Sequence, residues 1–231
     1  MISTERLTHV FVEVADTLVA NFDIVEFLHD LSDHAADVSG AEAVGIVLAD
    51  HRGRLQFMAA SNASGRALEL FQLQADEGPC LDCFRSRSPV VNADLGAADA
   101  LWPRFAPQAR AAGFQSVHAF PMRLRDDVIG ALNLFGSSPL RFGPGEVDIV
   151  QSLADIATIA ILQQRQLARA EALTEQLHGA LNSRITIEQA KGALSQRESI
   201  TPDAAFELMR REARAGRRPL LEVAAEVLDA G

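Results

Sequence analysis

The sequence predicts an α+β domain, with an antiparallel sheet flanked by helices, then a long coiled-coil helix and a C-terminal three-helix bundle. Three observations support this. Short apolar segments are grouped as two hairpins with helical segments between them, helical periodicity runs from Glu146 to about Ser199, and two short amphipathic segments end the chain. Strands grouped in this way are typical of the α+β class.

Composition restricts the class of protein. The 231 residues are 48% apolar with a net charge of −10, which excludes disordered, collagen-like and disulfide-rich chains. No window approaches the ~20 apolar residues of a membrane helix. Glu5 and Arg6 stand where a signal peptide needs an apolar run, and the chain has two cysteines. We therefore expect a cytoplasmic protein without membrane partners.

Two helices are expected in the first 40 residues. The first rests on the helical spacing of Val10, Val14 and Leu18. Asp23 and Glu26 form a capping-box pattern for the second. Gly40 is expected to end it.

Five strands follow from apolar runs bounded by turn residues. The segments 43–49 and 55–60 predict one hairpin, and 117–124 with 128–135 predict another. A further strand begins at Pro89, and helices are expected over 64–73, from Gly78-Pro79 onward and within 95–113.

The region of roughly residues 20–165 resembles a GAF domain in element order and in two phrases, Asp76-Glu77-Gly78-Pro79-Cys80 and Ile129-Gly130-Ala131-Leu132-Asn133-Leu134. With the N-terminal helices, we assign residues 1–165 to this domain. The resemblance implies a sensor that responds to a small-molecule effector, a redox state or a partner. It names no ligand, so the cofactor stays unknown.

A long helix is predicted to follow, with residues 166–182 as a coiled-coil connector. Apolar and small residues recur at coiled-coil spacing, namely Leu167, Ala170, Thr174, Leu177 and Leu181. One interpretation is a single helix lying on its own domain. At ~1.5 Å per residue, however, the helix is longer than a small domain is wide, which favours a homodimer formed through it.

The last segment, residues 173–231, resembles an ANTAR domain. The pattern begins with Arg184, Ile187 and Ala190-Lys191-Gly192, continues with Ala205-Phe206 and closes with Val223-Ala224. The resemblance implies a transcription antiterminator that binds tandem hairpins in nascent leader RNA and prevents a terminator from folding. It implies three helices, the second capped by Thr201.

The residues themselves agree with a nucleic-acid partner. The first 164 residues carry 11 basic and 21 acidic residues, whereas the rest carry ten of each, so the tail is neutral. Arg184 and Lys191, the chain's one lysine, are two helical turns apart and share a face. Gly192 permits close approach by another helix or by RNA backbone. The remaining candidates are Arg210, Arg211, Arg214, Arg217 and Arg218.

These arginines have a plainer interpretation as a solvated helix face, with Glu207 and Arg211 as an i,i+4 pair. Phe206 is expected in the core, which leaves arginine planes to stack on bases.

Cys80 and Cys83 form a lone C-x-x-C on a predicted helix, a candidate redox pair. Two further ligands for zinc are missing, so we expect no metal site. His118 stays open as a haem ligand, against the plainer interpretation of a satisfied strand histidine. No catalytic motif occurs, so we expect a non-enzyme.

Two alternatives stay open. In one, the chain is a ligand or redox sensor whose C-terminal helices bind a protein or duplex DNA. In the other, Cys80 or Cys83 is a catalytic thiol.

Overall fold

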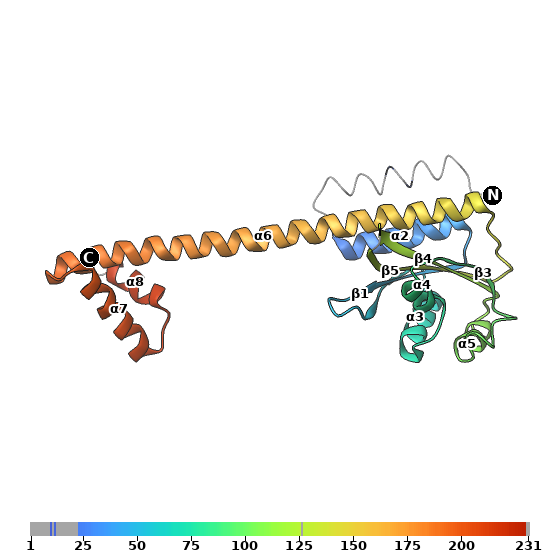
Figure 1. Cartoon of the computed structure of the whole chain (residues 1–231), viewed down its shortest axis with the longest axis horizontal. Coiled ribbons are helices and arrows are strands. Elements are labelled where there is room, and N and C mark those ends of the chain that lie inside the picture. Colours follow the sequence, from blue (N-terminus) through green and yellow to red (C-terminus); the bar gives the residue numbers. More distant parts are fainter. Residues whose placement is uncertain (1–9, 11, 13–22, 126, 230–231) are drawn as a thin grey trace. The chain divides into compact units, whose positions relative to one another are not determined.

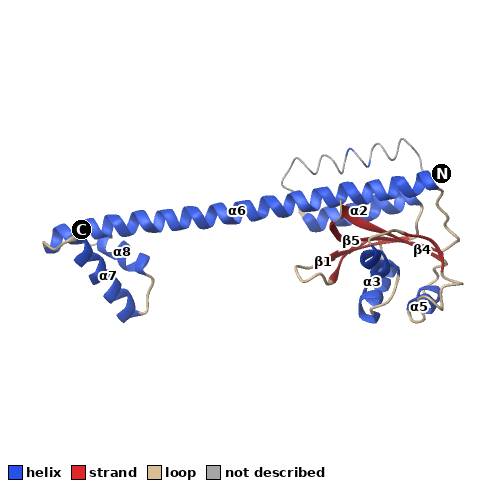
Figure 2. Cartoon of the chain, in the orientation of Figure 1, coloured by secondary structure: helices blue, strands red, loops and turns tan. Residues whose placement is uncertain are grey.

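The computed structural model describes residues 10, 12, 23–125 and 127–229. It confirms the predicted fold class, because a five-stranded antiparallel sheet lies between two sets of helices and a long helix with two short ones follows (Figures 1 and 2). The chain divides into two compact units, Met1–Arg165 and Gln166–Gly231. Of the first predicted helix, only Val10 and Val12 are described, and the rest lies outside the described residues.

The elements of the first unit follow the predicted order. They are α2 (Ile24–Ser39), β1 (Ala43–Ala49), β2 (Leu55–Ala60), α3 (Ala63–Ala75), α4 (Pro79–Ser86), β3 (Val90–Asp94), α5 (Phe105–Ala111), β4 (Ser116–Leu124), β5 (Asp127–Gly136) and the first part of α6 (Pro144–Glu198). The strand order is β2-β1-β5-β4-β3, with every neighbouring pair antiparallel.

Helices α2 and α6 cover one face of the sheet (Figure 1). Their core takes alternate residues of β1, namely Val44, Ile46 and Leu48, because successive strand side chains point to opposite faces. Asp23 caps α2 by accepting from the backbone N–H of Val25, as the capping pattern predicted, and Gly40 ends it in the left-handed conformation.

Helices α3, α4 and α5 cover the opposite face. Trp102 and Phe105 pack edge to face there, with ring centroids 5.9 Å apart. Because β1 is buried on both sides, its near-continuous apolar run is explained. On this face β5 carries Asn133, and its partner in β1 is Gly45, which has no side chain.

Side chains from β3 and β4 tie the segment before α6 to the sheet. The Asn92 amide donates to the Phe142 carbonyl at 3.0 Å and accepts from its N–H at 2.7 Å. His118 Nδ1 accepts from the Asn92 backbone N–H, and Nε2 lies 3.1 Å from the Leu140 carbonyl. The Ser116 hydroxyl binds Ser138 and Leu140. The entry to α6 is therefore held by the sheet rather than by loop contacts alone.

The second unit contains the rest of α6 together with α7 (Pro202–Gly216) and α8 (Leu220–Asp229). Its small core joins Ala190 and Leu194 of α6 to Met209 of α7 and Val223 of α8. Thr201 caps α7 as predicted. Phe206 is only half-buried at the edge of this core, rather than inside it.

Replacing Asn92 by alanine tests the tether. Asn92→Ala removes two hydrogen bonds and leaves alanine at a φ of 58°, so we expect a loss of about 2–4 kcal/mol in the free energy of unfolding. Asn92→Gly, which tolerates that φ, should lose about 1 kcal/mol less. Urea unfolding of both variants measures this, and equal losses would show that backbone strain contributes nothing.

Candidate functional site

A buried polar cluster lies between α3, α4 and the sheet. Glu69 and Gln72 come from α3 and Asn133 from β5, and all three side chains are fully buried. Gln72 donates from Nε2 to Glu69 Oε2 at 3.2 Å, and its Oε1 accepts from the backbone N–H of Cys80 at 3.0 Å. The cluster thus connects the two helices to the centre of the sheet.

Gly45 makes room for this cluster. It pairs with Asn133 across β1 and β5, and a Cβ atom at Gly45 would lie 2.2 Å from Glu69 Oε1. Any larger residue at this position would displace the carboxyl group. The glycine therefore has a tertiary cause that the strand pattern alone does not reveal.

The cluster is incompletely satisfied. Among the described residues, Glu69 Oε1 and both amide atoms of Asn133 have no hydrogen-bond partner. Leaving such atoms buried and unpaired costs about 1–3 kcal/mol each. Burial raises the pKa of Glu69 from 4.5 to about 8, and Asn133 opposes this only in part, because its geometry falls short of a hydrogen bond. At neutral pH the carboxyl group is mainly protonated.

Both cysteines lie beside this cluster. Cys80 and Cys83 are on α4, as predicted, but both are fully buried free thiols. Burial raises the pKa of Cys83 to about 12 and that of Cys80 well above its ordinary value, with a smaller contribution from Glu69. Such thiols carry little reactive thiolate at neutral pH. The arrangement favours packing over redox chemistry.

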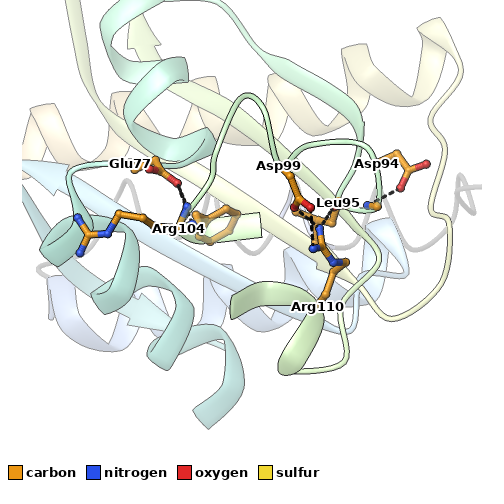
Figure 3. A network of polar contacts seen from close by, with 8 residues as sticks. Glu77, Asp94, Leu95, Asp99, Arg104 and Arg110 are labelled. Atoms are coloured by element: carbon orange, nitrogen blue, oxygen red, sulfur yellow. Dashed lines mark hydrogen bonds and ion pairs between the residues drawn. The ribbon is translucent and has the colours of Figure 1, made fainter. Parts of the chain in front are cut away.

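A second polar network holds the segment before α5 over the same face (Figure 3). Glu77 Oε1 accepts from the backbone N–H groups of Arg104 and Phe105 at 2.7 and 2.8 Å. Arg110 binds Asp99 at 2.6 Å and the Leu95 carbonyl. The sequence does not reveal these contacts, because the partners lie far apart along the chain. Together they hold the loop in place.

His118 lacks a free ring nitrogen, since both contact backbone groups. Burial lowers its pKa from 6.5 to about 4, so it is neutral at pH 7. It stacks on Phe142 with centroids 4.4 Å apart. These contacts favour a satisfied strand histidine over a haem ligand, because neither ring nitrogen is available to bind iron. Within the described ranges, no group of three or more metal-ligating side chains gathers.

An open hollow of about 770 Å³ lies elsewhere in the first unit, at the edge strand β2. Phe57 and Met58 contribute to its lining, and Arg66 lies 5.7 Å from the Phe57 ring centroid. This hollow is large enough for a small molecule and is separate from the buried cluster.

The candidate residues on α6 differ in their surroundings. Arg184 is exposed and has no ion pair among the described residues. The Lys191 side chain is 22% exposed, and its Nζ lies 2.5 Å from Glu188 Oε2. Gly192 is exposed, and nothing described lies within 4 Å of the place of a Cβ atom there. No helix of the same chain therefore requires this glycine.

The arginines of α7 and of the turn after it divide into paired and unpaired groups. Glu207 pairs with Arg210 at 2.7 Å rather than with Arg211 as predicted, and the Arg210 guanidinium lies 5.7 Å from the Phe206 ring centroid. Arg218 forms a two-point ion pair with Glu226. The exposed arginines without an ion pair in the described chain are Arg211, Arg214 and Arg217.

Comparison with known families gives two matches. The model of the GAF domain matches residues 23–162, and the model of the ANTAR domain matches residues 175–228. No curated protein sequence matches the chain. Across the described residues, every helix is too short or too polar to cross a membrane.

Solved structures show the fold of the first unit. The chain resembles the GAF domain of an Acinetobacter phosphoenolpyruvate-protein phosphotransferase, with 16% identity, TM-score 0.55 and coverage of 71% of this chain and 97% of that one. It also resembles a Neisseria meningitidis free methionine-R-sulfoxide reductase, with 18% identity, TM-score 0.55 and coverage of 72% of this chain and 96% of that one. The GAF domain of a Coxiella burnetii phosphoenolpyruvate-protein phosphotransferase matches with 16% identity, TM-score 0.57 and coverage of 72% of this chain and 99% of that one.

The buried carboxyl group predicts a pH dependence. Because the folded-state pKa of Glu69 is raised, its contribution to stability falls as pH rises from about 4.5 to about 8, by about 1.4 kcal/mol per pH unit. We expect Glu69→Gln to remove this slope. Urea unfolding of wild type and variant across that range measures the difference, and parallel curves would mean that Glu69 is not buried as a neutral acid.

The buried cysteines are predicted to react slowly with thiol reagents in the native protein. Because both thiols are buried, we expect a thiol-specific reagent to modify the native chain more slowly than the urea-unfolded chain by a factor on the order of 100 or more. Stoichiometric modification of native protein at pH 7 within minutes would contradict this. It would favour a reactive pair.

Proposed function

Because this chain belongs to the GAF-domain family and carries an ANTAR domain, we propose that it is a signal-responsive transcription antiterminator. In this proposal the ANTAR domain binds hairpins in nascent leader RNA, and the GAF domain regulates that binding. Two copies associate through α6 and engage two hairpins.

The observation that carries the proposal is the ordered ANTAR match over residues 175–228. The charges of that unit support it, because Arg184, Arg211 and Arg214 present guanidinium groups without acidic partners in the described chain. Free guanidinium groups bind phosphate and stack on splayed loop bases. Lys191 adds a compact cation to the same helix, two turns beyond Arg184.

Association of two copies is supported by α6 itself. Its segment at the start of the second unit exposes large apolar side chains, which is unfavourable in a monomer. These are Leu167, Leu173, Leu177 and Leu181.

The hollow at β2 is the place where an effector binds the GAF domain in this proposal. We propose regulation rather than catalysis for this domain, because both thiols are buried. The similar reductase from Neisseria meningitidis shares the fold, at an identity that carries no activity across.

Gel-shift titration of the full chain against a tandem-hairpin leader RNA tests the function. We expect Arg184→Ala and Lys191→Ala each to weaken binding by roughly tenfold, because each removes a cation from the RNA face. Arg169→Ala is the matched control, since it removes an exposed arginine of the same helix outside the ANTAR match. It should bind like wild type.

Scrambled loops and duplex DNA complete the experiment. Binding that needs the loop sequence supports hairpin recognition, whereas duplex binding with a steep salt dependence supports the DNA-binding alternative. Absence of RNA binding by oxidised, reduced and effector-screened protein alike would overturn the proposal. A protein partner for the C-terminal helices would then be the better hypothesis.

A further inference from the structure

The apolar stripe of α6 changes its spacing where the ANTAR domain begins. From Leu167 the small and apolar positions advance in steps of three and four to Leu181. A regular heptad would place Arg184 next, with Lys191 one heptad later. A second step of four instead reaches Ile185, and steps of three and four then pass Glu188 and reach Gly192. Two consecutive steps of four are a stutter, which locally unwinds a coiled coil.

Burial distinguishes these two paths. The Lys191 side chain is only 22% exposed, because its neighbours Ala190 and Leu194 belong to the core formed with α7 and α8. Its ammonium group is paired with Glu188. That side of α6 is already occupied by its own unit. A second helix therefore has no access to a seam that runs through Lys191.

The alternative path is open. Ile185 is 47% exposed, and Gly192 has nothing described within 4 Å of its Cβ position. A β-branched apolar residue and a glycine, seven residues apart, suit a helix that packs closely. Both lie on the same side of α6, continuous with the stripe above them.

A second copy of this chain is the occupant that fits. Residues Leu167, Leu177 and Leu181 are 45–60% exposed, and the positions between them in the repeat are Ala170 and Thr174, so no charge interrupts the seam before Leu181. A seven-residue repeat matches an identical repeat in register, whereas a globular partner has no need of that period. In the second unit, α7 and α8 pack on the other side of the helix.

We propose that the dimer seam of α6 continues through Ile185 and Gly192 into the ANTAR domain by a stutter. This inference rests on the proposed dimeric antiterminator and adds an interface inside its RNA-binding unit. Arg184 and Lys191 then flank the seam instead of entering it. Each copy therefore keeps this pair of cations available to RNA, directly beside the junction with its partner.

Disulfide cross-linking of the full chain tests the path of the seam. The buried native cysteines are retained, and single cysteines are introduced as Ile185→Cys, Gly192→Cys, Arg184→Cys and Lys191→Cys. A disulfide needs Cβ atoms about 4 Å apart, so we expect Ile185→Cys and Gly192→Cys to form cross-linked dimers at least roughly fivefold faster than their neighbours. Faster cross-linking through Arg184→Cys and Lys191→Cys would overturn the stutter.

A matched pair of glycines provides the second measurement. Gly179 and Gly192 both lie in α6 with open space at the Cβ position, but Gly179 falls on the outer side of the repeat. We expect Gly192→Glu to raise the dimer dissociation constant at least about tenfold in sedimentation equilibrium without RNA, because two buried glutamates would face each other. Gly179→Glu should leave it unchanged, and equal dissociation constants would overturn the seam.

Failure of this inference and failure of the proposed function give different results. Wild-type protein that binds hairpin RNA but cross-links along the regular heptad retains its function and loses the stutter. Protein that cross-links through Ile185→Cys and Gly192→Cys but binds no RNA retains the seam and loses the function. A wild-type chain that stays monomeric at micromolar concentration overturns the seam together with the proposed dimer.

Discussion

A single continuous helix, α6, contributes to two separate cores and exposes an apolar stripe between them, all within 55 residues. In the first unit it buries Leu153, Ala157 and Ile161 against the sheet. Further along it exposes a leucine stripe, and near its end it buries Ala190 and Leu194 in another core. An α-helix has no freedom to rotate one part of its surface independently of the next. The spacing of apolar residues therefore decides which face is buried at each point.

The segment before this helix is held to the sheet by several hydrogen bonds. Asn92, Ser116 and His118 bind alternate residues of the preceding segment, so the sheet edge and the entry to α6 move together. On the opposite face, the Glu69 cluster leaves buried polar atoms unpaired. These unpaired atoms lower the stability of this face relative to a fully hydrogen-bonded interior.

Charge in the second unit is less uniform than its composition suggests. Residues 166–231 carry nine basic and ten acidic residues, but the ion pairing is selective. Glu207 and Glu226 neutralise Arg210 and Arg218, while three other arginines of the same cluster stay unpaired. The proposed contact with RNA would therefore rest on local contacts rather than on a long-range field, since the first 164 residues carry the net charge of −10.

The sequence by itself determined the fold class, the order of the elements and both family resemblances, because periodicity, caps and ordered motifs are local properties. Asp23, Gly40 and Thr201 occupy the caps that their neighbours in sequence require. Only the tertiary structure decided that Cys80 and Cys83 are buried, that Glu69 lies against Gly45, and that Arg210 rather than Arg211 pairs with Glu207. The first two depend on contacts between residues far apart in the chain. The third depends on the choice of side-chain rotamer between an i,i+3 and an i,i+4 partner, which no pattern of residue types encodes.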